Sequence, residues 1–175
     1  NRVSGMVSYQ DLENMEAHSE GLEHAVVVGG GLIGIEMAEM FHARHIPVTM
    51  LVRESNYWNN VLPEEESEMI SKHIIKNNID LRLGVNLGEI KDDGSGKANA
   101  VIVKETGEEI ACGYVGLTAG VSPNVGWLKE TSLEVERGIL VDDYLQTNIP
   151  DVYAIGDCAQ LRRPKSGRRN IEAIW

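Results

Sequence analysis

Apolar runs and helix-spaced apolar residues alternate along the first half of this chain. Residues 26–28 and 48–52 are short runs rich in apolar, mostly β-branched side chains, and residues 32–41 between them carry apolar side chains at helical spacing. A helix is expected over residues 63–76, where a proline and three glutamates come first. Residues 79–83 form a third strand-like run. Strands that alternate with helices predict a parallel sheet joined by right-handed crossovers.

The pattern changes in the second half of the chain. Residues 87–91, 98–104 and 109–111 are short strand-like runs separated by turns that contain glycine. Three such runs predict a three-stranded antiparallel meander. Further strands are expected at residues 114–118, 138–141 and 152–155.

The turn between the first strand and the first of these helices has the form Gly-x-Gly-x-x-Gly, at Gly29, Gly31 and Gly34. Such glycines permit a tight turn, a close approach of the backbone to a pyrophosphate, and close packing of the helix on the sheet. Leu32 and Ile33 then open a helix whose free N–H groups can bind phosphate. A glycine-rich turn without a ligand is the alternative. We predict an α/β fold, a Rossmann-like parallel sheet with an inserted three-stranded antiparallel meander, and a dinucleotide site.

Arg53 and Glu54 follow the second strand, where the adenosine ribose of a dinucleotide is expected. A carboxylate here accepts hydrogen bonds from the ribose hydroxyls of NADH and repels the 2′-phosphate of NADPH, whereas Arg53 alone could pair with that phosphate. NADPH sites usually gather more than one cation, and Asn59 and Asn60 supply none. We therefore expect the chain to bind NAD(P)H, with NADH favoured.

Composition and charge narrow the function further. The 175 residues are 42% hydrophobic and carry a formal net charge of −11, which disfavours a nucleic-acid surface. Basic residues cluster at 162–169, which predicts a solvated loop or, alternatively, a docking patch for an acidic electron-carrier protein. Cys112 and Cys158 lack metal-ligand spacing and are expected to be buried thiols. Because neither a signal peptide nor a membrane span is evident, we expect a cytoplasmic protein.

Two further segments, together with the meander, resemble the flavin-dependent pyridine-nucleotide oxidoreductase superfamily. One is the turn Ala119-Gly120-x-x-Pro123-Asn124, and the other is Thr147-x-x-Pro150 followed by the sequence Asp-Val-Tyr-Ala-Ile-Gly-Asp, which ends at Asp157. The resemblance covers nearly all of the chain. It implies an NAD(P) domain inserted into an FAD domain, with hydride transfer from a reduced nicotinamide to FAD and electrons passed to an acceptor. Gly120 is assigned with the cofactor-binding residues.

The resemblance also implies roles for three residues. Asp157 would hold the ribityl hydroxyls of FAD, and a helix that starts after Gly156 would point its N-terminus at the FAD pyrophosphate. Glu36 would lie beside the nicotinamide and flavin and pair with a lysine of the FAD domain, which makes it the candidate catalytic residue. The alternatives are a plain helix cap at Asp157 and a solvent-facing helix acid at Glu36.

The family's N-terminal glycine-rich FAD motif does not occur in these 175 residues. We therefore expect residues 1–145 to be an NAD(P)-binding domain and residues 146–175 a return segment to an incomplete FAD-binding domain, with FAD bound in a full-length parent and the isolated fragment inactive. A helix that begins near Ile171 would be cut at Trp175. The loop at residues 53–58 looks closer to the non-disulfide branch, such as rubredoxin, ferredoxin and monodehydroascorbate reductases. The alternative is an NAD(H)-responsive binding or signalling flavoprotein similar to apoptosis-inducing factor.

Overall fold

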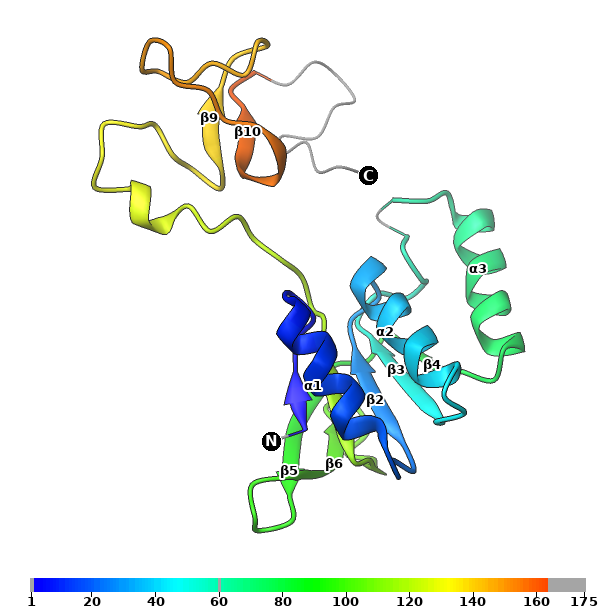
Figure 1. The fold of residues 1–175 in the computed structure, drawn as a ribbon. Coiled ribbons are helices and arrows are strands. Elements are labelled where there is room, and N and C mark those ends of the chain that lie inside the picture. The colour runs from blue at the N-terminus through cyan, green and yellow to red at the C-terminus, as the bar shows by residue number, and fades with distance from the viewer. Residues whose placement is uncertain (1, 60, 164–175) are drawn as a thin grey trace. The chain divides into compact units, whose positions relative to one another are not determined.

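A computed structural model describes residues 2–59 and 61–163. The chain forms two compact units, Asn1–Gly120 and Val121–Trp175 (Figure 1). The expected division between an NAD(P)-binding domain and a return segment lies between residues 145 and 146, and it stays a prediction. Among the described residues, no helix combines the length and the apolar character that crossing a bilayer would require.

The first unit is built on a parallel sheet of five strands in the order β1-β8-β2-β3-β4. Its strands are β1 (Val3–Ser4), β2 (Ala25–Val28), β3 (Val48–Val52), β4 (Asp80–Leu83) and β8 (Tyr114–Leu117). From β2 the chain proceeds through β3 to β4 on one side and then returns to β8 on the other side of β2. All of these strands except β1 were predicted from the sequence.

Three helices cover one face of this sheet: α1 (Tyr9–Ser19), α2 (Leu32–His42) and α3 (Glu64–Lys76) (Figure 1). Their apolar side chains form one core with those strand residues that point to this side, among them Val27, Met50 and Tyr114. Phe41 of α2 contacts Tyr114 of β8 edge to face, with ring centroids 5.1 Å apart. Because α2 crosses the sheet so closely, a side chain at Gly116 of β8 would overlap Met37.

The opposite face of the sheet carries the antiparallel meander, formed by β5 (Leu87–Asp92), β6 (Ala98–Val103) and β7 (Glu109–Ala111). Successive strand residues point to opposite faces, so Val26, Leu51 and Val115 pack here against Val101 and Val103. The unit therefore has three layers: helices, parallel sheet and meander. This architecture confirms the predicted α/β fold.

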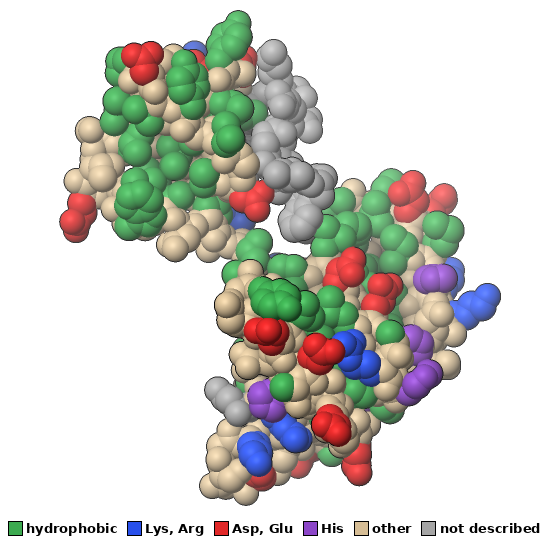
Figure 2. All heavy atoms as spheres, viewed as in Figure 1, with side chains coloured by type: hydrophobic (Ala, Val, Ile, Leu, Met, Phe, Trp, Pro, Cys, Tyr) green, Lys and Arg blue, Asp and Glu red, His purple; other side chains and the backbone are tan. Residues whose placement is uncertain are grey.

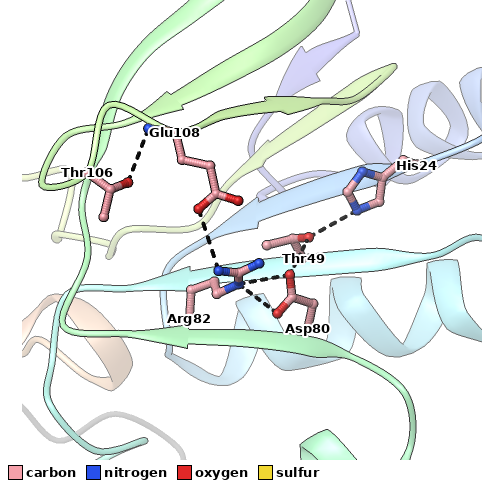
Figure 3. Close-up of polar contacts among 6 residues, drawn as sticks. All are labelled: His24, Thr49, Asp80, Arg82, Thr106 and Glu108. Atoms are coloured by element: carbon pink, nitrogen blue, oxygen red, sulfur yellow. Dashed lines mark hydrogen bonds and ion pairs between the residues drawn. The ribbon is translucent and has the colours of Figure 1, made fainter.

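A polar network ties the meander to the sheet at the end where the strands begin (Figure 3). The buried hydroxyl of Thr49 lies 3.0 Å from Nε2 of His24 and donates to Oδ2 of Asp80 at 3.3 Å. Arg82 Nε donates to both carboxylate oxygens of Asp80, and its Nη1 lies 3.6 Å from Oε2 of Glu108. Glu108 belongs to the turn before β7, so the network links β3 and β4 to the meander.

The second unit has a small core around two parallel strands, β9 (Ile139–Val141) and β10 (Ala159–Leu161). Two short 3-10 helices accompany them, η1 (Gly126–Leu128) and η2 (Gly156–Cys158). Strand β9 agrees with the strand predicted at 138–141, whereas β10 was not predicted.

Two expectations for the second unit are wrong. Residues 152–155 do not form a strand: Tyr153 makes one isolated bridge to Gln146, and the side chain of Ile155 remains 72% exposed. The helix expected after Gly156 is a single 3-10 turn, because the chain is extended over residues 159–161, which pair with β9 as strand β10. The helix expected near Ile171 lies outside the described residues.

We expect Thr49→Val to lower the free energy of unfolding by about 1–2 kcal/mol. The substitution preserves the shape of a buried side chain but leaves His24 and Asp80 without their common partner. Urea denaturation measures the change. Thr106→Val is the control: it removes an exposed hydroxyl that accepts a hydrogen bond from the backbone N–H of Glu108, at 3.1 Å, and should cost no more than about 0.5 kcal/mol. Equal losses in the two variants would show that the network does not hold the meander.

Candidate dinucleotide-binding site

The carboxyl ends of β2, β3 and β8 meet at one edge of the sheet and surround a cleft of about 250 Å³. The strand order reverses at β2, and in open parallel sheets ligands bind outside the carboxyl ends of the strands at such a reversal. The cleft is lined by Val28, Gly29, Gly30, Gly31, Leu51, Arg53, Glu54, Trp58, Val85, Asn86, Leu87, Thr118, Ala119 and Gly120. Five residues assigned to the cofactor from the sequence thus lie together: Gly29, Gly31, Arg53, Glu54 and Gly120.

The glycine loop packs against the end of β8. Gly29 has a left-handed backbone (φ 124°), and a Cβ there would lie 2.6 Å from the carbonyl oxygen of Thr118. A Cβ at Gly34 would overlap the carbonyl oxygen of Gly29 and come within 2.9 Å of Oγ1 of Thr118. Thr118 in turn donates from its N–H and from its hydroxyl to the carbonyl oxygen of Val28, at 2.8 and 2.9 Å. Gly29 and Gly34 are therefore required by packing.

Gly31 differs from these two glycines because no atom lies within 4 Å of where its Cβ would be. It occupies the N-cap position of α2, and its carbonyl oxygen accepts the first helical hydrogen bond, from Ile35 N at 3.2 Å. The N–H groups of Leu32, Ile33 and Gly34 precede that bond and are free to bind an anion. The loop thus offers backbone donors and the open space above Gly31 that a pyrophosphate would need.

Arg53 and Glu54 form an ion pair at the end of β3, with 2.7 Å between Arg53 Nε and Glu54 Oε1. The hydrogen bond and the charge of Glu54 raise the pKa of Arg53 above its ordinary value. The Arg53 side chain is 75% exposed and that of Glu54 only 27% exposed. The carboxylate therefore forms part of the cleft wall, with the guanidinium in contact with it.

Sequence reasoning missed several residues of the cleft. Trp58 lies in the loop after β3, Asn86 and Leu87 follow β4, and Thr118 follows β8. The end of each of these strands was foreseeable from the apolar runs, so a search of the residues that follow parallel strands would have found Asn86 and Thr118. Trp58 carries no such signal, because it lies six residues beyond the end of β3.

The remaining site residues lie elsewhere. Glu36 is exposed on α2, does not line the cleft, and has no recorded partner among residues 2–59 and 61–163. Gly156 and Asp157 belong to the second unit, where Asp157 is exposed in the turn η2. Their roles with nicotinamide and flavin stay predictions.

The two cysteines differ in burial, and the described part of the basic cluster takes part in an ion pair. Cys112 is buried, and burial raises the pKa of its thiol to about 11, which keeps it protonated and unreactive. Cys158 is a free thiol that is only partly buried. In the basic cluster, Arg162 pairs with Glu134. Residues 164–169 of that cluster lie outside the described part of the chain.

Known proteins are similar to this chain in sequence and in fold. A "Nitric oxide reductase FlRd-NAD(+) reductase" of Vibrio vulnificus is 33% identical over 160 residues, which are 91% of this chain and 41% of that protein. The ferredoxin reductase for the CYP199A2 system of Rhodopseudomonas palustris superposes with a TM-score of 0.84 at 28% identity, over 90% of this chain and 38% of that one. The chain thus spans about two-fifths of the length of these relatives.

A second solved structure, the covalent putidaredoxin reductase–putidaredoxin complex, superposes with a TM-score of 0.85 at 25% identity. It matches 91% of this chain and 38% of the solved chain. The sequence profile of the pyridine nucleotide-disulphide oxidoreductases matches residues 2–173, almost the whole chain. With the glycine loop, the cleft and the meander in place, the chain belongs to the pyridine nucleotide-disulphide oxidoreductase family.

Proposed function

We propose that the first unit binds NADH in the cleft at the carboxyl edge of its parallel sheet. The observation that carries this proposal is the glycine loop: Gly31 leaves open space beside the free N–H groups of Leu32, Ile33 and Gly34, as a pyrophosphate requires. Glu54, which lines the same cleft, would accept hydrogen bonds from the adenosine ribose hydroxyls.

We further propose that the chain is the NAD(P)H-binding part of a flavin-dependent oxidoreductase of the non-disulfide branch. When both cofactors are bound, a hydride would pass from C4 of the nicotinamide to N5 of FAD. The protein would hold the rings together and exclude water. Glu36 is exposed on α2, which suits a pair with a lysine of the flavin domain.

The electron acceptor we propose is a small redox-carrier protein. The relatives reported above are named for FlRd, for a ferredoxin and for putidaredoxin, and their names as reductases favour an enzyme over a signalling flavoprotein. If the carrier is acidic, the basic residues at 162–169 would contribute to binding it. The rest of the binding surface would come from parts of a longer protein that this chain does not include.

We assign the second unit to the flavin side of the protein, with Asp157 holding the ribityl chain. Its surface carries apolar side chains (Figure 2), which a folded partner domain would cover. Tyr144, Tyr153 and Ile155 are all more than half exposed. The chain supplies no second glycine-rich motif for the adenosine half of FAD.

Replacing Gly31 tests the dinucleotide site. We expect Gly31→Val to weaken NADH binding at least about a hundredfold, which is about 2.7 kcal/mol, because the side chain would fill the space of the pyrophosphate. The fold should persist, since no atom lies within 4 Å of that position. Calorimetry measures binding and circular dichroism the fold. Gly126→Val, also in open space but outside the cleft, should bind as the wild type does. Undiminished affinity in folded Gly31→Val would refute the site.

Titration with both coenzymes tests the choice of NADH. We expect NADH to bind more tightly than NADPH, because the Glu54 carboxylate repels a 2′-phosphate and Arg53 is already paired with Glu54. Glu54→Ala should narrow the preference, whereas Glu65→Ala, an exposed acid in the first turn of α3, should leave it unchanged. Tighter binding of NADPH by tenfold, about 1.4 kcal/mol, would make Arg53 the selector instead.

An absorption spectrum tests the division between the two cofactors. We expect the 175-residue chain to purify without stoichiometric FAD, because the adenosine half of the FAD site would be missing, and with it most of the contacts that offset the cost of immobilising a large ligand. A longer protein that includes the flavin domain should be yellow and lose flavin on Asp157→Ala. Asp151→Asn is the control, since asparagine tolerates the left-handed backbone there (φ 62°). A stoichiometric flavin spectrum from the 175-residue chain would contradict this division.

A further inference from the structure

The loop after β3 places a buried tyrosine beneath the glycine loop. Tyr57 is only 3% exposed, and its hydroxyl donates to the carbonyl oxygen of Gly31 at 3.3 Å. Its ring also lies beside Gly30, where a Cβ would be 3.6 Å from Cε2 of the tyrosine. Tyr57 does not line the cleft, so a bound dinucleotide would meet the loop above it rather than the tyrosine itself.

Helix α3 holds Tyr57 in this position. The carbonyl oxygen of Tyr57 accepts a hydrogen bond from the hydroxyl of Ser67, which is fully buried. The hydroxyl of Ser71, one turn further along α3, donates to the carbonyl oxygen of Ser67 at 2.9 Å. Tyr57 is thus hydrogen-bonded to α3 through its backbone carbonyl and to Gly31 through its hydroxyl.

The direction of the Gly31 carbonyl decides where the next N–H points. That carbonyl and the N–H of Leu32 belong to one planar trans peptide, so they point in opposite directions. The carbonyl accepts from both Tyr57 and Ile35, which directs it toward the body of the protein and along α2. The N–H of Leu32 therefore faces away from α2, on the side where the helix N-terminus is open.

We propose that Tyr57 is a positioning residue for the pyrophosphate of the dinucleotide. Tyr57 acts through the Gly31–Leu32 peptide and does not contact the pyrophosphate itself. Its hydroxyl fixes the Gly31–Leu32 peptide with the donor already aimed at the ligand, so that binding need not first order the loop. The inference rests on the proposed NADH site and adds a residue that neither the glycine motif nor the cleft lining contains.

The protonation state of Tyr57 suits this role. Burial, followed by the negative charge of Glu39, raises the pKa of its phenol to about 12. The group is therefore a neutral O–H donor throughout the pH range in which the protein would be assayed.

The experiment compares Tyr57→Phe with Tyr114→Phe in the 175-residue chain. Both remove one hydroxyl from a buried tyrosine, but the Tyr114 hydroxyl lies 2.6 Å from Oγ of Ser4, outside the cleft lining. We expect Tyr57→Phe to weaken NADH and ADP-ribose three- to tenfold, the range that one hydrogen bond typically covers. Adenosine lacks the pyrophosphate, so its affinity should be the same in the variant as in the wild type. That affinity is measured by the displacement of NADH. Tyr114→Phe should lower the melting temperature and leave all three affinities unchanged.

Two further measurements separate positioning from a general loss of structure. Ser67→Ala keeps the Tyr57 hydroxyl but releases its backbone, and should weaken NADH less than Tyr57→Phe while also sparing adenosine. The ratio of wild-type to Tyr57→Phe affinity should be the same at about pH 6 and about pH 9, because the phenol does not titrate there.

The outcomes are distinguishable. Wild-type protein that fails to bind NADH would refute the proposed function, and this inference with it. Wild-type binding together with an unchanged Tyr57→Phe affinity would overturn only the role of Tyr57. An equal loss for adenosine and NADH would also overturn it, because a positioning residue for the pyrophosphate cannot affect a ligand without one.

Discussion

The structure depends on the contact between the glycine loop and the end of β8. Gly29 and Gly34 have no room for a Cβ. Thr118, which follows β8, occupies the space at Gly29, and the carbonyl oxygen of Gly29 together with Thr118 occupies the space at Gly34. This approach brings the first turn of α2 down onto the sheet and places its free N–H groups at the edge where three parallel strands end. Fold and site therefore share one constraint: the close packing that completes the core also creates the anion-binding position.

The two ends of the parallel sheet have different roles: the carboxyl end forms the cleft, and the amino end joins the sheet to the meander. At the carboxyl end, the cleft offers free backbone donors and the open space beside Gly31. At the other end, the buried Thr49 hydroxyl and the Asp80–Arg82 pair satisfy one another and join the meander to the sheet. A binding surface must leave polar groups unpaired for its ligand, whereas a structural contact must pair them. The meander can thus be held firmly without closing the site.

The sequence was sufficient to predict those strands and helices whose local apolar pattern agrees with the way they pack in the fold. The runs at β2 and β3 are apolar on both faces, as a strand covered on both sides requires, and the helix spacing of α2 matches its buried residues Met37 and Phe41. Strand β10 could not be predicted, since three residues acquire strand geometry only by pairing with β9. The segment at residues 152–155 misled for the opposite reason: its residues favour strands, but Val152, Tyr153 and Ile155 are exposed and the segment makes one isolated bridge. Tyr57 was visible as a loop residue, but its link to Gly31 spans 26 positions and follows only from the fold.

The edges of the parallel sheet have a consequence for the behaviour of the protein in solution. One outer strand, β1, has two residues, and the other, β4, carries the Asp80–Arg82 ion pair in its four. An unpaired strand edge is a template on which another chain can add a strand, and short or charged edges discourage such addition. Asp80 and Arg82, which link the sheet to the meander, also place charges on the β4 edge. The same two side chains therefore disfavour the addition of another strand at that edge.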